Sequence, residues 1–239
     1  MSTKAGQQDP APPLISPADA VQTMEWIHEQ VRNNRPLPVP EGELLVDVLL
    51  MNPDIGYAPG SVPELIFSGN QTASHSLEVA LLAMAFADGS DFSPEDVRRL
   101  GLAGLFHNVG MAFVPPDILE KPGVLDAAEL DRMKRHPLDG ARVLLNSDTH
   151  LGLAAVVAYE HHMTHDGGGY PPRRQERQPH QASRIIQVCD IYVAMRTDRP
   201  NRPAWSHDQV RSQLAERAGL DIDPDVTNKF LQLFPASGQ

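Results

Sequence analysis

The sequence is poor in features that would each indicate a particular class of protein. Cys189 is its one cysteine, which excludes an intrachain disulfide and a cysteine-based zinc site and fits a reducing compartment. No uninterrupted apolar run reaches the roughly 18 residues of a membrane-spanning helix. The N-terminus also lacks the apolar core of a signal peptide. We therefore expect a cytoplasmic protein that does not contact a membrane.

Positive charge is also scarce. Lysine and arginine number 20 against 31 aspartates and glutamates, which gives a formal net charge of -11. A broad basic surface for a nucleic-acid backbone is thereby excluded, and we predict no nucleic-acid partner. Any anionic ligand should be small and bound by a few local cations or by metal ions.

Hydrophobic spacing along the chain follows a helical period throughout, without the alternation of a β-sheet. This pattern predicts an all-α fold, a helical bundle preceded by a short N-terminal helical annex. Residues 1–15 are rich in Pro, Gln and Ala and should form a disordered tail. We divide the rest into an annex at 16–70, the main domain at 71–205 and closing helices at 206–239.

Capping residues and breakers give the expected helix boundaries. Ser16 and Pro17 suit an N-cap and first turn, and residues 35–40 should break that first helix before a second at 43–51. The main domain and the C-terminal part should contain helices at 74–86, 97–106, 126–135, 137–145, 151–160, 183–195, 206–218 and 224–233.

Histidines are concentrated in the main domain, where eight of the ten lie between positions 75 and 180. Imidazoles together with a carboxylate suit Mn, Fe or Zn ions. Taken singly, His75 could be a packed or capping residue, His136 a helix-end residue, and Asp190 a surface acid. The adjacent His161 and His162, and an Asp190 set among isoleucines and valines, favour a metal pocket instead.

Several short motifs occur in a recognisable order over the main domain. They are His107-Asn108-Val109-Gly110, Pro116-Asp117-Ile118-Leu119, Lys121-Pro122-Gly123, Lys134-Arg135-His136-Pro137, His161-His162, Asp166-Gly167-Gly168-Gly169-Tyr170-Pro171, Asp190 and Asp198-Arg199-Pro200. Together they resemble the HD-GYP family, bacterial metal-dependent phosphohydrolases that cleave cyclic di-GMP. The resemblance implies an HD-domain-like fold and a cyclic di-GMP or related nucleotide ligand.

The resemblance also implies roles for individual residues. The implied metal ligands are His75, His107, His136, His161, His162 and Asp190, for Fe or Mn rather than Zn and for one ion rather than two. The implied substrate-binding residues are Arg199, Arg202, Gly169, Tyr170 and Pro171. The Gly-Tyr-Pro loop would also contact a signalling partner, and a homodimer is a further expectation. The alternative for the arginines is two solvated loop residues, and for the loop a plain glycine turn.

The departures from the family pattern affect the metal centre. Asn108 stands where the family has a bridging aspartate, and a neutral amide lacks the charge for bridging. Met111 replaces a lysine and Gln71 a glutamate found in some members. We therefore predict a cyclic di-GMP phosphodiesterase with an impaired metal site. The alternatives are a non-catalytic adaptor or nucleotide-binding module, and a helical domain whose histidines are only structural.

Overall fold

The computed structural model describes residues 16–51, 67, 70–147, 149–173, 177–198 and 203–236. Within these ranges the regular elements are helices, with two isolated bridges and no strand. They are α1 (Pro17–Arg32), α2 (Val39–Met51), α3 (Gln71–Asp88), α4 (Pro94–Phe106), η2 (Val109–Phe113), α5 (Pro116–Leu119), α6 (Ala127–Met133), α7 (His136–Ser147), η3 (Thr149–Leu151), α8 (Gly152–Glu160), α9 (Gln181–Arg196), α10 (His207–Arg217) and α11 (Pro224–Leu233).

The all-α prediction is confirmed, and the caps explain where several helices begin. Ser16 and Asp19 form a capping box at α1, and Asp126 and Glu129 form another at α6. Ser93 accepts a hydrogen bond from the Asp96 backbone at the start of α4. These side chains satisfy backbone N–H groups that have no partner within the helix, so each start is encoded locally.

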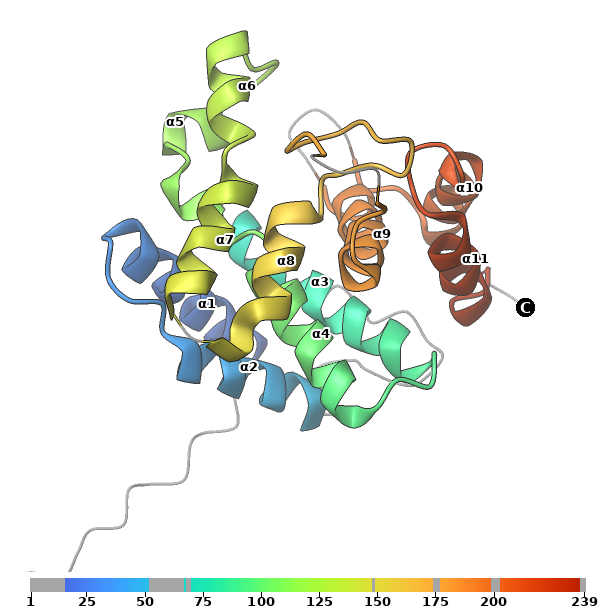
Figure 1. The fold of residues 1–239 in the computed structure, drawn as a ribbon, viewed down its shortest axis with the longest axis horizontal. Coiled ribbons are helices and arrows are strands. Elements are labelled where there is room, and N and C mark those ends of the chain that lie inside the picture. Colours follow the sequence, from blue (N-terminus) through green and yellow to red (C-terminus); the bar gives the residue numbers. More distant parts are fainter. Residues whose placement is uncertain are drawn as a thin grey trace, which may run out of the picture.

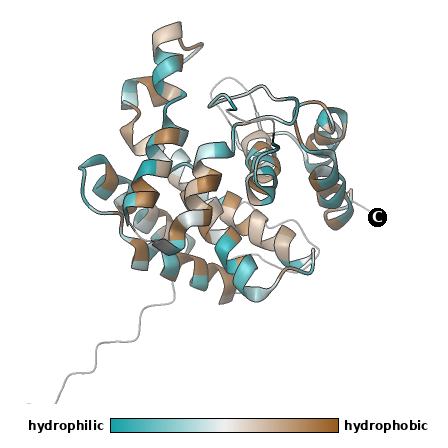
Figure 2. Ribbon diagram, in the orientation of Figure 1, coloured by the Kyte–Doolittle hydropathy of each residue, from teal (hydrophilic) through white to brown (hydrophobic). Residues whose placement is uncertain are grey.

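The centre of the bundle is α3, which is buried along nearly its whole length between Ala73 and Ala87. It contacts α1, α2, α4 and α9. A Cβ on Gly104 would lie 2.9 Å from the Cα of Ala80, so the glycine permits the close crossing of α3 and α4. Most outer helices carry both hydrophobic and hydrophilic residues (Figure 2), as expected for elements with one face on a core.

The remaining helices are arranged around and beyond these four neighbours of α3 (Figure 1). The annex helices α1 and α2 lie on one side, α10 and α11 pack against α9 on the other, and α5 and α6 project at one end. Among the described residues no helix is both long and apolar enough to cross a bilayer. In the middle of the bundle, α8 packs against α7, α4 and α9, and α9 also contacts α3 and α4.

Two local expectations differ from the structure. The break expected at 35–40 ends earlier, because α2 begins at Val39 with Pro40 in its first turn, a position that needs no backbone N–H donor. The short elements η2 and α5 were not anticipated, since runs of four or five residues give too little periodicity to detect.

Candidate metal centre

The six residues predicted as metal ligands lie on different elements and come together beside α3. His75 is on α3, His107 follows α4, His136 opens α7, His161 and His162 follow α8, and Asp190 is on α9. Their ligand atoms form two groups, each within 4.8 Å. We call His136, His161 and His162 the three-histidine cluster, and His75, His107 and Asp190 the Asp190 cluster.

The two clusters adjoin each other. The rings of His107 and His161, one from each cluster, have centroids 5.1 Å apart in an edge-on arrangement. His107, His136 and His161 are buried, with 0, 1 and 0% exposure. Buried imidazole rings need hydrogen-bond or metal partners, because burying an unpaired polar group costs folding free energy. The groups therefore form one continuous polar pocket inside the bundle.

Backbone carbonyls fix the tautomers of three of these histidines. Nδ1 lies 2.6 Å from the Gly104 oxygen in His107, 2.8 Å from the Met133 oxygen in His136, and 2.9 Å from the Ala158 oxygen in His161. A carbonyl can only accept, so each Nδ1 carries the proton and donates it. Each Nε2 is then left with a lone pair, the arrangement that ligating histidines adopt.

Among the described residues, no proton donor satisfies these Nε2 atoms. Those of His136 and His161 face each other at 3.3 Å, and that of His107 is buried with no hydrogen-bond partner among the described residues. Burial and neighbouring rings lower the pKa of His136 to about 3 and that of His161 well below its usual value. The rings are neutral at pH 7, and a cation between them fits these lone pairs.

Asp190 points into the pocket, so the surface-facing alternative is wrong. Its Oδ1 lies 2.8 Å from Nε2 of His75, and the two side chains are 14% and 15% exposed. Burial raises the pKa of Asp190, but the hydrogen bond and charge of His75, with His107 and His162, hold it well below its usual range. Because a carboxylate only accepts, His75 donates the Nε2 proton, which a metal ion would have to displace.

Asn108 is buried next to His107, and its side-chain oxygen has no hydrogen-bond partner in the described part of the chain. The position therefore lies within the pocket region, but it offers a neutral amide instead of an anion. Met111 and Gln71, the other two departures, both line a cavity on the α1 side of the pocket. All three replacements remove charge from the same part of the molecule.

The Gly-Tyr-Pro loop lies over the three-histidine cluster. The Tyr170 ring stacks on His162 at 4.6 Å, and Tyr170 N donates to the His162 oxygen at 3.1 Å. Gly169 has a φ of +73°, and a Cβ there would lie 2.1 Å from the same oxygen, which explains the glycine. Pro171 follows. Arg199 and Arg202 lie outside the described residues.

Sequence reasoning missed two buried acids that neighbour predicted ligands along the chain. Glu78, one turn after His75 on α3, has a pKa raised to about 7 by burial, which the charge of His75 partly offsets. Glu160, at the end of α8, accepts hydrogen bonds from His180 N at 2.7 Å and Ser183 Oγ at 2.9 Å. An acid within an apolar helical run was the available signal for Glu78.

Comparisons with known proteins agree with this architecture. A family model described as HD domain matches residues 61–226. A cyclic di-GMP phosphodiesterase of Pseudomonas aeruginosa is 37% identical over 172 residues, covering 72% of this chain and 41% of the relative. A cyclic di-GMP phosphodiesterase response regulator of Xanthomonas campestris is 32% identical over 147 residues, covering 61% and 39%.

Other relatives differ in the nucleotide that they are named for. A 3'3'-cGAMP-specific phosphodiesterase of Vibrio cholerae is 28% identical over 190 residues, covering 79% of this chain and 36% of the relative. The solved structure of an HDG"Y"P protein from Bdellovibrio bacteriovorus matches with a TM-score of 0.59 at 14% identity, covering 90% of this chain and 68% of that one. The chain spans about two fifths of the length of these curated relatives.

Proposed function

The chain belongs to the HD-GYP group of the HD-domain family, and from that membership we propose that it is a metal-dependent phosphodiesterase acting on a cyclic dinucleotide, cyclic di-GMP first. The observation that carries the proposal is the set of inward-facing Nε2 atoms on His107, His136 and His161. A purely structural cluster would pair these atoms with donors. Relatives named for cyclic di-GMP and for cGAMP support the substrate class.

We assign the metal to His75, His107, His136, His161, His162 and Asp190. Five imidazoles and one carboxylate exceed the four ligands of a tetrahedral zinc site and suit Fe or Mn better. A bound ion of this kind polarises a phosphoryl oxygen and activates water as a nucleophile. The backbone carbonyls at Gly104, Met133 and Ala158 keep the ligand rings oriented, and Tyr170 covers the His162 face.

The proposed site is altered, holding one ion and turning over slowly. Asn108 adds no negative charge that would offset the repulsion between the five histidines when they are protonated. Asp190 is the anionic side chain among the assigned ligands, so a second divalent ion would have to share it with the first. Met111 likewise brings no cation to stabilise a transferring phosphoryl group. Both replacements lower the expected rate without removing the fold.

A second candidate function is a non-catalytic adaptor that binds the nucleotide and presents the Gly-Tyr-Pro loop to a signalling protein. It is favoured by the same Asn108 and Met111, since loss of charge costs catalysis more than binding. Tyr170 is held by His162 on one face, while the Lys134 ammonium lies 5.7 Å from its ring centre. A loop so anchored would present a fixed surface.

Two measurements on one sample distinguish these candidate functions. Purified protein loaded with Mn²⁺ or Fe²⁺ under reducing conditions is assayed for bound metal and for linear product from cyclic di-GMP at high protein concentration. About one ion with slow turnover supports the altered enzyme. One ion with tight nucleotide binding and no product supports the adaptor. No bound metal under any loading condition would overturn both and leave the histidines structural.

A further inference from the structure

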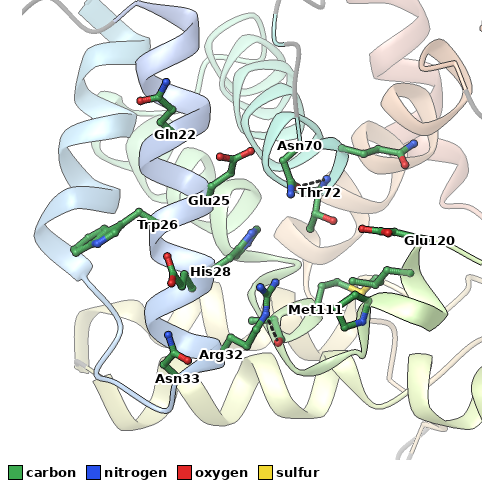
Figure 3. Close-up of a pocket in the computed structure, with 15 residues that line it drawn as sticks. Gln22, Glu25, Trp26, His28, Arg32, Asn33, Asn70, Thr72, Met111 and Glu120 are labelled. Carbon is green, nitrogen blue, oxygen red and sulfur yellow. Dashed lines mark hydrogen bonds between the residues drawn. The ribbon is translucent and has the colours of Figure 1, made fainter.

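A cavity of about 770 Å³ lies between α1 and the start of α3, the helix that carries His75. Its walls come from one face of α1, the start of α3, η2 and α5 (Figure 3). Figure 3 shows the side chains of Glu25, His28 and Arg32 projecting from α1 toward Asn70 and Met111 on the opposite wall. The cavity is therefore shared by the annex and the main domain.

Arg32 is the cation of this cavity. Its Nε donates to the Ala112 oxygen at 3.3 Å, which holds the guanidinium beside Met111. No carboxylate of the described residues lies within ion-pair distance of Arg32, and its two terminal nitrogens make no hydrogen bond there. A guanidinium with two free terminal nitrogens is suited to a bidentate contact with a phosphate.

His28 adds an unsatisfied polar group to the same wall. It is 5% exposed, and its Nε2 is buried with no hydrogen-bond partner among the described residues. Burial and the charge of Arg32 lower its pKa to about 4, so the ring is neutral and can donate to a ligand oxygen at pH 7. The positive end of the long helix α3 opens on the cavity through Asn70, Gln71 and Thr72.

Acidic side chains share the cavity with Arg32 and His28. Glu25, Glu29 and Glu120 are exposed lining residues, and they would repel an anion that filled the whole space. Arg32, His28 and the start of α3 are the lining groups that would attract an anion. The start of α3 also connects the cavity with the metal centre, because Gln71 lines the cavity and His75 follows one turn later on the same face of α3.

We propose that Arg32 binds the phosphodiester group of a cyclic dinucleotide that is not being cleaved at the metal centre. This inference rests on the proposed function, since it needs one phosphodiester at the metal ligands and the second in the cavity. It makes the annex helix α1 part of the substrate site. It also gives a reason for an unpaired arginine held in place by the Ala112 carbonyl.

The test measures binding, so it does not depend on turnover. Cyclic di-GMP is titrated calorimetrically into the Mn²⁺-loaded full chain, its Arg32→Gln variant and a matched Arg35→Gln control. Arg35 is three residues away and hydrogen-bonds Gln30 at 2.9 Å. We expect Arg32→Gln to weaken binding roughly 10- to 100-fold and Arg35→Gln to leave it within about twofold. GMP has a single phosphate and should bind all three proteins alike.

A conservative variant separates ligand binding from a structural role. Arg32→Lys keeps a cation at the same place in the cavity but not the paired donors of a guanidinium, so it should retain part of the affinity that Arg32→Gln loses. Equal affinities for the Arg32→Gln and Arg35→Gln proteins, an Arg32→Lys protein that binds as weakly as Arg32→Gln, or an equal loss for GMP would overturn the inference. If the unchanged protein binds metal but not cyclic di-GMP, the proposed function itself fails.

Discussion

Nε2 of His136 and Nε2 of His161 face each other at 3.3 Å, and neither carries a proton, because both Nδ1 atoms donate to backbone carbonyls. Two lone pairs at hydrogen-bond distance repel each other unless a cation or a donor lies between them. The contact is therefore unfavourable without metal and becomes favourable with it. This contact favours metal binding and lowers the stability of the metal-free protein.

His136→Gln should change metal affinity and metal-free stability in opposite directions. The amide N–H₂ can donate to His161, so the chelator-treated variant should be about 1 kcal/mol more stable than the unchanged protein. Metal affinity should fall at least 10-fold, as for loss of a ligand or its support. Urea unfolding with and without chelator, beside elemental analysis, measures both. His150→Gln, a half-exposed histidine bonded to Glu43, is the control and should change neither.

Asn108→Asp should increase the amount of metal bound. The new carboxylate adds an anion next to His107, so we expect a second ion and, combined with Met111→Lys, at least 10-fold faster cleavage of cyclic di-GMP. Without metal, the same buried charge should destabilise the protein by about 1–3 kcal/mol. Metal stoichiometry and turnover are measured together. An unchanged stoichiometry would mean that position 108 does not reach the metal.

His28 should make the protein sensitive to acid. Its folded pKa of about 4 lies below the unfolded value of 6.5, so the unfolded state binds more protons between these limits. Its contribution to stability is fully present above pH 6.5 and is lost as the pH falls toward 4, by up to about 1.4 kcal/mol per pH unit. Urea unfolding at several pH values should show a shallower dependence for His28→Leu. An identical slope would contradict this.

Gly110→Ala should disturb the metal centre by displacing the backbone next to His136. A Cβ there would lie 2.0 Å from the His136 oxygen, so η2 or α7 must move, at a cost of about 3 kcal/mol or more. Gly152→Ala is the matched control, because a Cβ at the first residue of α8 meets nothing within 4 Å. That change should be neutral or stabilise by about 0.5–1 kcal/mol. Thermal unfolding distinguishes the two.

Glu160→Ala should loosen the loop that carries Tyr170. Removing this buried carboxylate leaves His180 N and Ser183 Oγ without their acceptor, at an expected cost of about 2–3 kcal/mol. Glu95, 72% exposed and paired with Arg99, is the control, and its alanine variant should lose less than about 0.5 kcal/mol. Faster hydrogen exchange across 161–180 in the Glu160 variant would locate the effect. An unchanged exchange pattern would argue against it.

The fold was predictable because its signals are local. Caps such as Ser16 and Asp126 and the apolar period of the helices predicted the all-α class, and the family motifs predicted the HD-like arrangement. The α2 start at Val39 was not predicted, because a proline in a first turn looks the same in sequence as a breaker. The isolated turns η2 and α5 were too short for a periodic signal.

The site was predictable only as a set of residue types. Histidine spacing and motif order selected six residues that the structure brings together, and their role as ligands stays a prediction. The carbonyl contacts of Nδ1, the pairing of His75 with Asp190 and the burial of Glu78 depend on helix packing. The cavity next to Arg32 forms because α1 packs against η2. Neither segment has a sequence pattern that predicts this contact.

The two clusters differ in the length of the chain segment that lies between their members. His136 and His161 are 25 residues apart, whereas His75 and Asp190 are 115 apart. Closing the longer segment costs about 1 kcal/mol more conformational entropy, since the cost rises with the logarithm of length. The three-histidine cluster should therefore assemble first during folding, and Asp190 joins only when α9 docks. An ion present while the chain is still folding would be captured by imidazoles before any carboxylate reaches it.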